Sequence, residues 1–319
     1  MLILVTGGGG FIGSHLVDRL LGDGHQVRVL DNFSTGRREN LVSVSSEIEI
    51  VEGDVQSYER AHTAVRGADA VFHEAALPSV PRSVQDPLTS NAANVVGTLN
   101  VLLASRDSGV RRVVLASSSS VYGANEVLPK HEELTPQPIS PYAVAKLACE
   151  GYARAFGQVY GLETVALRYF NVFGPRQDPL SQYAAVIPNF IGAALGDRPA
   201  TVFGDGEQSR DFTYVDDVVA ATVLAMDCEP AAGQVFNVAS GRSVSVNRLL
   251  EEIRALTGRD LPVRHVAARR GDIRHTQADI SRVRAVLGYH PRFELDQGLQ
   301  RTLEHFAEQP GSPDALPVS

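Results

Sequence analysis

Four consecutive glycines, Gly7 to Gly10, restrict the possible folds of this chain more than any other sequence feature. They follow the apolar run Leu2–Val5, which predicts a buried strand, and precede Phe11–Leu21, whose apolar spacing predicts a helix. Together with Gly13, such glycines let a chain turn tightly and bring backbone N–H groups and a helix N-terminus to a pyrophosphate. A flexible loop is the alternative. We favour a dinucleotide-binding turn.

The first half of the chain repeats this alternation of apolar runs and amphipathic segments. Short runs rich in β-branched residues predict buried strands at 2–5, 27–30, 48–51, 70–72, 112–116 and 164–167. Helical spacing occurs at 91–105 and 142–160, and later at 186–194, 216–226, 246–256, 280–287 and 295–307. The alternation predicts an α/β fold with a Rossmann-type, doubly wound parallel sheet.

The character of the sequence changes after Phe173, where prolines become frequent and the predicted helices are less regularly spaced. We therefore predict a dinucleotide-binding Rossmann domain over residues 1–173. A smaller α/β C-terminal lobe over 174–319 would mainly bind substrate. The two parts are expected to pack closely, with some elements crossing between them.

Composition excludes several classes of protein. The 319 residues carry 29 Lys and Arg against 37 Asp and Glu, a net charge of −8 that disfavours sequence-independent binding to nucleic acid. Two cysteines are too few for a disulfide framework, and no metal site is predicted. There is neither a signal-peptide pattern nor an apolar run of about 20 residues. We expect a cytoplasmic protein with no membrane or nucleic-acid partner.

An acidic residue at the end of the second predicted strand favours NAD as the dinucleotide. The carboxylate of Asp31 can accept hydrogen bonds from the adenosine ribose hydroxyls, and it would repel a 2′-phosphate. Arg37 and Arg38 follow closely and keep NADP as the alternative.

Polar or small residues also follow the third and fourth predicted strands, where ligands bind in parallel sheets. Asp54 either contacts the adenine or caps a helix. Ala75 and Ala76 are small enough for a flat cofactor to approach, although ordinary close packing of a loop would also explain them.

Tyr142 and Lys146 form a candidate acid/base pair, because residues four apart share one face of a helix. An ammonium and a cationic nicotinamide nearby would favour the phenolate, so that Tyr142 could exchange protons near neutral pH. The same ammonium could bind the nicotinamide ribose. Tyr-x-x-x-Lys also occurs by chance, and its position downstream of the glycine turn gives it weight.

A run of serines, Ser117 to Ser120, follows the fifth predicted strand. A hydroxyl at this place could bond the reacting sugar oxygen and share its proton with Tyr142. A serine-rich turn that only ends the strand is the alternative, and the run does not reveal which serine would act.

These motifs together resemble the extended short-chain dehydrogenase/reductase family, and within it the NAD-dependent UDP-hexose 4-epimerases. The resemblance extends from Leu2 to Phe306. Its markers are the segments 6–13, 31–32, 117–123, 142–146, 167–175, 204–212 and 269–274.

The resemblance implies a bound NAD and a UDP-sugar substrate. The implied catalytic residues are Ser118, Tyr142 and Lys146. The implied cofactor-binding residues are Gly7, Gly10, Phe11, Ile12, Gly13, Asp31, Asn32, Ser34, Thr35, Gly36, Asp54, Val55, Ala75, Ala76, Asn94, Ser117, Tyr142, Lys146 and Tyr169. The implied substrate-binding residues are Ser79, Ser118, Ser119, Tyr142, Asn171, Val186, Phe203, Gln208, Arg210, Arg269, Asp272 and Thr276.

Two arginines in the second half would clamp the diphosphate of that substrate. The forked guanidinium groups of Arg210 and Arg269 suit phosphate oxygens. The same residues could also have purely structural roles: Arg210 could pair with Asp211 or Asp216, and Arg269 could belong to a solvated basic run.

The implied reaction is inversion at C4 of a UDP-sugar through a transient 4-keto intermediate, with NAD unchanged overall. Related dehydratases carry an Asp-Glu pair where this chain has Ser119 and Ser120, and decarboxylases a Glu at the second of these positions. A glucuronate-specific branch often carries a basic residue at position 178, which is Asp178 here, although Arg176 is near. A dehydratase, a decarboxylase or a glucuronate 4-epimerase is the alternative enzyme, and an NAD-binding regulator the alternative outside enzymes.

The resemblance also bears on substrate size and on assembly. A bulky Tyr at position 276 would restrict such a site to glucose and galactose, whereas the small Thr276 admits an N-acetyl group. We therefore expect UDP-GlcNAc/UDP-GalNAc, with or without UDP-Glc/UDP-Gal, as substrates. Relatives pair through two long helices, so a homodimer through 91–105 and 142–160 is expected.

Overall fold

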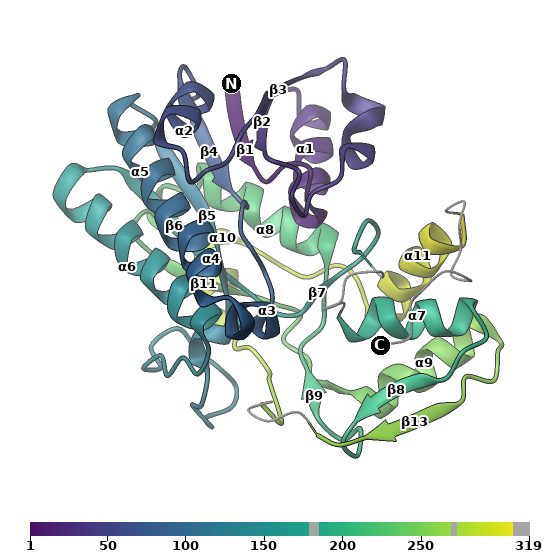
Figure 1. Ribbon diagram of the computed structural model, residues 1–319. Helices are drawn as coiled ribbons and strands as arrows, with labels where there is room; N and C mark the ends of the chain where they lie inside the picture. Colours follow the sequence, from purple (N-terminus) through teal and green to yellow (C-terminus); the bar gives the residue numbers. More distant parts are fainter. Residues whose placement is uncertain (179–184, 269–272, 309–319) are drawn as a thin grey trace.

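A computed structural model describes residues 1–178, 185–268 and 273–308. Within them, seven parallel strands form one central sheet in the order β11-β6-β5-β4-β1-β2-β3 (Figure 1). These strands are β1 (Leu2–Thr6), β2 (Gln26–Asp31), β3 (Ile48–Glu52), β4 (Ala70–His73), β5 (Arg112–Ser118), β6 (Glu163–Tyr169) and β11 (Val235–Val238). The predicted doubly wound sheet is confirmed.

The strand order reverses beside β1, which pairs with β2 on one side and with β4 on the other. Thr6 stands opposite Leu30 of β2 and opposite His73 of β4, so three strands end at the same level. In open α/β sheets ligands bind outside the carboxyl ends of the strands at such a switch point.

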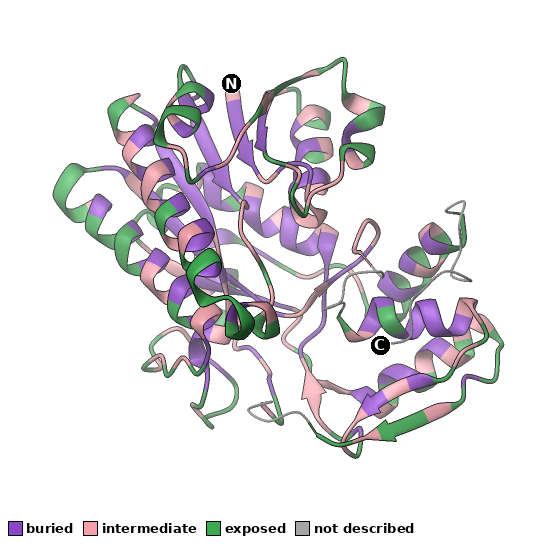
Figure 2. Ribbon diagram, viewed as in Figure 1, coloured by how far each residue is buried: buried purple, intermediate pink, exposed green. Residues whose placement is uncertain are grey.

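Helices cover both faces of the sheet. On one face lie α1 (Phe11–Gly22) and α8 (Val215–Asp227), and on the other lie α2 (Tyr58–Val65), α5 (Gly97–Asp107) and α6 (Pro141–Tyr160). The strands between them are largely buried, except for the edge strand β3, which is partly exposed (Figure 2).

Side chains of β1 alternate between the two layers of core. Ile3 and Val5 join the cluster that contains Leu16 of α1, whereas Leu4 joins the cluster that contains Val101 of α5. The period of two along a strand and the absence of a solvated face explain the continuous apolar runs of the sequence.

The helix predicted over 91–105 is divided. It consists of α4 (Pro87–Asn91), a π-helical turn (Ala92–Val96) and α5, preceded by the short α3 (Val80–Gln85). The buried side chain of Asn94 bonds both backbone groups of Leu77, at 2.9 Å to the N–H and 3.1 Å to the carbonyl. This tie to the loop after β4 falls on the π turn, a distortion often found at functional sites.

The C-terminal half contains further small elements. Helices α7 (Val186–Leu195), α9 (Val246–Thr257), α10 (Ser281–Leu287) and α11 (Leu295–Glu308) appear near their predicted positions. Short strands pair as β7 (Val172–Phe173) with β10 (Thr213–Tyr214), β8 (Ala200–Phe203) with β13 (Val263–Val266), and β9 (Ser209–Arg210) with β12 (Val244–Ser245). Two elements of this half belong to the first lobe instead: β11 is a strand of the central sheet, and α8 packs on its face.

Candidate active site

The glycine turn leaves no room for side chains. Gly7 has φ +70°, and a Cβ added there would lie 2.7 Å from the backbone of Ala75. A Cβ at Gly13 would lie 2.2 Å from the carbonyl oxygen of Gly7. The chain therefore passes tightly from β1 into α1, whose first residues are Phe11 and Ile12. Such a bare turn at a helix N-terminus fits the pyrophosphate of a dinucleotide.

Asp31 ends β2 directly beside this turn. Its Oδ2 accepts the Gly9 N–H at 2.9 Å, and its Oδ1 accepts the Phe33 N–H at 2.7 Å. Burial raises the pKa of the carboxyl, and the two N–H groups act against this rise. Asp31 thus fixes the turn through both of its carboxylate oxygens.

The two arginines that could favour a 2′-phosphate both have carboxylate partners. Arg38 pairs with Glu52 at 2.5 Å, and its guanidinium also lies 4.1 Å from the centre of the Phe33 ring. Arg37 pairs with Asp178 at 2.7 Å. These contacts fit NAD rather than NADP.

The loop after β2 bonds to the loop after β3. Asn32 donates from Nδ2 to Asp54 at 2.8 Å, and Asp54 also accepts the N–H of Gln56. The N-cap of α2 is Ser57, so the alternative that Asp54 caps this helix is wrong.

The other predicted cofactor residues of these two loops lie close to these contacts. The N–H of Ser34 bonds Asn32, and Thr35 lies in the same loop. A Cβ at Gly36 would be 2.9 Å from Asp31, and one at Gly97 would be 2.6 Å from Val55. Val55 therefore packs against α5.

Ala75 and Ala76 begin the loop after β4, beside the glycine turn. The Ala75 N–H bonds the hydroxyl of Thr6 at 3.3 Å. Farther along, Ser79 has φ +102°, a strained value for a residue with a side chain, and its hydroxyl accepts the N–H of Arg82. The structure thus brings the predicted Ser79 close to the start of α3.

Tyr142 and Lys146 share one face of α6, as predicted. The helix begins at Pro141 behind the N-cap Ser140, and the free N–H of Tyr142 bonds the buried hydroxyl of Ser83 at 3.1 Å. The Lys146 ammonium donates to the carbonyl of Ala116 at 2.8 Å and lies 5.9 Å from the centre of the Tyr142 ring. The pair therefore stands at the carboxyl end of β5.

The serine run begins at the end of β5. Ser118 is the last residue of the strand, and its Oγ accepts the N–H of Ser120 at 3.2 Å. Ser119 opens the short 3₁₀ helix Ser119–Tyr122. Ser117 points elsewhere: it donates to Glu150 of α6 at 2.5 Å. The structure therefore separates Ser117, which is tied to a carboxylate, from Ser118.

Glu150 belongs to a buried network that the sequence motifs did not reveal. It receives two bonds from Arg168 of β6, at 2.8 and 2.7 Å, and both side chains are about 5% exposed. Arg168 also lies over the Tyr122 ring, and Tyr122 donates to Asn237 of β11. The position of Glu150, four residues after Lys146, was the available signal.

Glu74 is a second residue that no sequence motif marked. It follows β4 and accepts a hydrogen bond from Tyr169 at 2.9 Å. Tyr169, predicted to bind the cofactor, therefore directs its hydroxyl to Glu74 and to Thr222. Burial raises the pKa of Glu74 to about 7 and lowers that of His73 to about 3.

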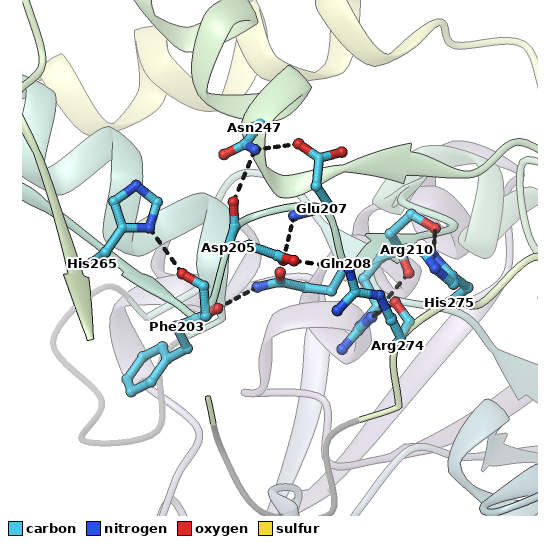
Figure 3. Close-up of polar contacts among 11 residues, drawn as sticks. Phe203, Asp205, Glu207, Gln208, Arg210, Asn247, His265, Arg274 and His275 are labelled. Atoms are coloured by element: carbon cyan, nitrogen blue, oxygen red, sulfur yellow. Dashed lines mark hydrogen bonds and ion pairs between the residues drawn. The ribbon is translucent and has the colours of Figure 1, made fainter. Parts of the chain in front are cut away.

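Figure 3 shows polar contacts of the C-terminal half around β9. Arg210 donates to the carbonyls of Ser209 and Arg274, and Gln208 donates to the carbonyl of Phe203 at 2.8 Å. Arg274 pairs with Asp205. The predicted Arg269 and Asp272 lie outside the described residues.

The residue after Arg210 holds three segments together. Asp211 is buried and accepts the backbone N–H groups of Ser240, Gly241 and Ala278 together with the Ser240 hydroxyl. Burial raises its pKa to about 6. These four hydrogen bonds occupy the carboxylate of Asp211. The carboxylate of Asp216 lies near Arg301 and His15.

Three further predicted substrate residues come from separate segments. Thr276 donates its N–H to Ser209 at 3.0 Å, and its buried hydroxyl has no partner among the described residues. Asn171, at φ +30°, donates to the carbonyl of Asp211. Val186 is the first residue of α7.

The described residues contain neither a metal-binding cluster nor a membrane-spanning helix. No cluster of His, Cys, Asp and Glu in that part of the chain could hold a metal ion. Nor is any of its helices long and apolar enough to span a membrane.

Comparison with known proteins matches this chain to one family. Residues 3–239 match the model of the NAD dependent epimerase/dehydratase family. The UDP-glucose 4-epimerase of Mycolicibacterium smegmatis is 43% identical over 312 residues, covering 96% of this chain and 98% of the relative.

Two solved structures are also similar. One is a UDP-N-acetylglucosamine 4-epimerase from Methanobrevibacter ruminantium in complex with UDP-N-acetylmuramic acid, with TM-score 0.92, 42% identity and coverage of 96% and 97%. The other is a UDP-glucuronic acid 4-epimerase from Bacillus cereus with UDP-glucuronic acid and NAD, with TM-score 0.90, 32% identity and coverage of 96% and 98%.

Proposed function

Because the chain belongs to the NAD-dependent epimerase/dehydratase family, in its branch of UDP-sugar 4-epimerases, we propose that it inverts C4 of UDP-GlcNAc/UDP-GalNAc and of UDP-Glc/UDP-Gal. The observation that carries this proposal is the Tyr142–Lys146 pair at the end of β5, beside Ser118 and within the same sheet edge as the glycine turn. In this proposal residues 1–173 hold the cofactor, and 174–319 supply most of the sugar-nucleotide site.

Each catalytic residue has a separate task. Tyr142 takes the proton from the sugar 4-hydroxyl and later returns one, and Lys146 stabilises the phenolate by its positive charge. Ser118 bonds the reacting oxygen. When bound, NAD supplies the hydride acceptor and donor at C4. Rotation of the keto sugar between the two transfers then gives the opposite configuration.

Two features support this substrate preference. Thr276 is small, and no partner among the described residues occupies its hydroxyl. Asp178 places a carboxylate, paired with Arg37, where a glucuronate enzyme would need a cation, and Arg176 is engaged by Asp18 at 2.7 Å. Neither position therefore offers an unpaired cation to a sugar carboxylate, whereas a neutral acetamido group needs none.

The decisive experiment offers three substrates separately: UDP-Glc, UDP-GlcNAc and UDP-GlcA. NMR should show equilibration at C4 for the first two without added reductant, and little change for the third. Release of water or carbon dioxide would contradict the proposal.

The variant Tyr142→Phe should reduce turnover by at least about a hundredfold while NAD stays bound. Unchanged turnover in this variant would refute the proposed role of Tyr142.

The size of the sugar site can be tested at one residue. We expect Thr276→Tyr to lose UDP-GlcNAc turnover and to keep UDP-Glc turnover, because the larger ring fills the space proposed for the acetamido group. The measurement is kcat/KM for both substrates. Thr276→Ser is the matched control and should retain both activities. Undiminished UDP-GlcNAc turnover in Thr276→Tyr would refute the assignment.

We also propose a homodimer in the cytoplasm. Exposed apolar side chains lie along α6 at Val144, Tyr152 and Val159, with spacings of 8 and 7 residues that place them on one face. Leu88 of the adjacent α4 is 82% exposed. A second copy covering this face would remove the stripe from water. Both cysteines are unpaired, which fits a reducing compartment.

A further inference from the structure

Glu74 is a partly buried ionisable group at the proposed active site that the proposed mechanism does not use. It follows the last residue of β4, and its N–H bonds the carbonyl of Thr6 in β1. The alanine after it lies against the glycine turn. A carboxyl at this edge of the sheet therefore lies among the residues proposed to hold the cofactor.

The hydrogen bonds around Glu74 suit both of its protonation states. Thr222 of α8 donates its hydroxyl proton to the carbonyl of Val218 at 2.8 Å, and Tyr169 lies 2.8 Å from the same hydroxyl and 2.9 Å from Glu74. Tyr169 can donate to an ionised Glu74. It can equally donate to Thr222 and accept from a protonated Glu74. Glu74 and Tyr169 therefore stay bonded in either state, although with Glu74 ionised no proton is left for the Tyr169–Thr222 contact.

Glu74 and Lys146 lie at the same level of the sheet. His73 of β4 stands opposite Leu115 of β5, and Lys146 bonds the carbonyl of the next residue, Ala116. Glu74 is likewise the next residue after His73. The positive charge of Lys146 acts to lower the pKa of Glu74, and electrostatic interaction between two groups is mutual.

Among these groups, Glu74 is the one whose charge changes near neutral pH. His73 of β4 is held neutral, because burial lowers its pKa to about 3. From β6, burial raises the pKa of Tyr169 well above its usual value. Thr222 of α8 does not titrate, and Lys146 of α6 carries the positive charge. Burial raises the pKa of Glu74 itself to about 7.

We propose that Glu74 is a positioning residue that adjusts the acid/base pair through Lys146. An ionised Glu74 offsets part of the Lys146 charge, and so it weakens the stabilisation that Lys146 gives to the Tyr142 phenolate. A protonated Glu74 leaves that stabilisation intact. The inference rests on the proposed roles of Tyr142 and Lys146.

The test is a titration of the Tyr142 phenolate in the NAD-loaded protein. Its ultraviolet absorbance is obtained by subtracting the titration of Tyr142→Phe from that of the unaltered protein. The same subtraction is made in a Glu74→Gln background, where the glutamine can still accept from Tyr169 but cannot ionise. We expect Tyr142 to ionise about 0.5–1 pH unit lower in Glu74→Gln, and the acid limb of the kcat profile to move with it.

Two further variants make the result decisive. Glu49→Gln changes an exposed carboxylate of β3, paired with Arg28, and should leave the titration unchanged. Tyr169→Phe keeps the carboxyl but removes a donor to its anion, and should shift the Tyr142 titration in the same direction by less. It replaces Glu74→Gln if that protein does not fold.

An unshifted Tyr142 titration in folded, NAD-loaded Glu74→Gln would overturn the inference. The proposed function would survive that result, because its own test is the loss of turnover in Tyr142→Phe. Conversely, full turnover in Tyr142→Phe would refute the proposed function before Glu74 is considered.

Discussion

At the scale of single residues, the glycine turn shows how missing side chains let two backbone segments approach closely. Gly13 lies in the first turn of α1 and faces the carbonyl of Gly7, so that even one methyl group would displace backbone. We expect Gly13→Ala to lose most of its bound NAD. The measurement is the NAD content after gel filtration.

A second glycine of the same helix is the matched control. Gly22 ends α1, and a Cβ there meets no atom within 4 Å. Gly22→Ala should retain NAD and gain up to about 1 kcal/mol of stability. Full NAD content in Gly13→Ala would mean that the turn can open without cost to the cofactor site.

The charge of Glu74 also predicts how stability varies with pH. Its pKa is raised to about 7 from the usual 4.5, so between these values the folded protein binds a proton that the unfolded chain has released. The stabilisation that Glu74 gives to the folded protein is therefore fully present below pH 4.5, the pKa of Glu74 in the unfolded chain. It is lost as the pH rises through about 7, the pKa in the folded protein.

Urea unfolding of the unaltered protein and of Glu74→Gln at pH 5 to 8 tests this sign. Relative to the variant, the unaltered protein should lose about 2–3 kcal/mol of unfolding free energy over this range, and the difference should level off above pH 7. A constant difference would show that Glu74 is ionised in the folded protein throughout.

At the scale of elements, a buried ion pair joins α6 to the sheet. Glu150 joins α6 to Ser117 of β5 and to Arg168 of β6, while Tyr142 and Lys146 lie two turns and one turn earlier on the same face. Removing one partner would leave a buried charge without compensation.

We therefore expect Glu150→Gln to lower the free energy of unfolding by about 3 kcal/mol, measured by urea titration. Replacing both residues, as Glu150→Gln with Arg168→Met, should recover part of the loss. The exposed pair of Arg248 and Glu251 is the control, and Glu251→Gln should cost less than about 0.5 kcal/mol. Equal losses at both sites would contradict the structural role of the buried pair.

At the scale of the whole molecule, the apolar stripe on α6 and α4 predicts assembly. We expect Val144→Glu to convert the proposed dimer to monomers, because the charge would be buried in the interface. Sedimentation velocity measures the change. Leu224→Glu, on the opposite face of the sheet at a half-exposed position of α8, should leave the mass unaltered. If the unaltered protein sediments as a monomer, the proposed homodimer is wrong.

Much of the fold is determined by the sequence itself. Strands covered on both sides are apolar almost throughout, so β1 to β6 could be located from runs of three to five residues. The tight turn at Gly7 to Gly13 requires glycines, and residues four apart on α6 must share a face. Local spacing therefore predicted the dinucleotide fold, the NAD cofactor and the Tyr142–Lys146 pair.

Only the tertiary structure decided which distant residues meet. β11 enters the sheet after a long excursion of the chain, Arg168 meets Glu150, and Tyr169 directs its hydroxyl to Glu74. These contacts join residues 18 to 95 positions apart, for which no periodicity exists. A buried carboxyl and an exposed one look alike in a sequence, because burial is a property of the packed chain.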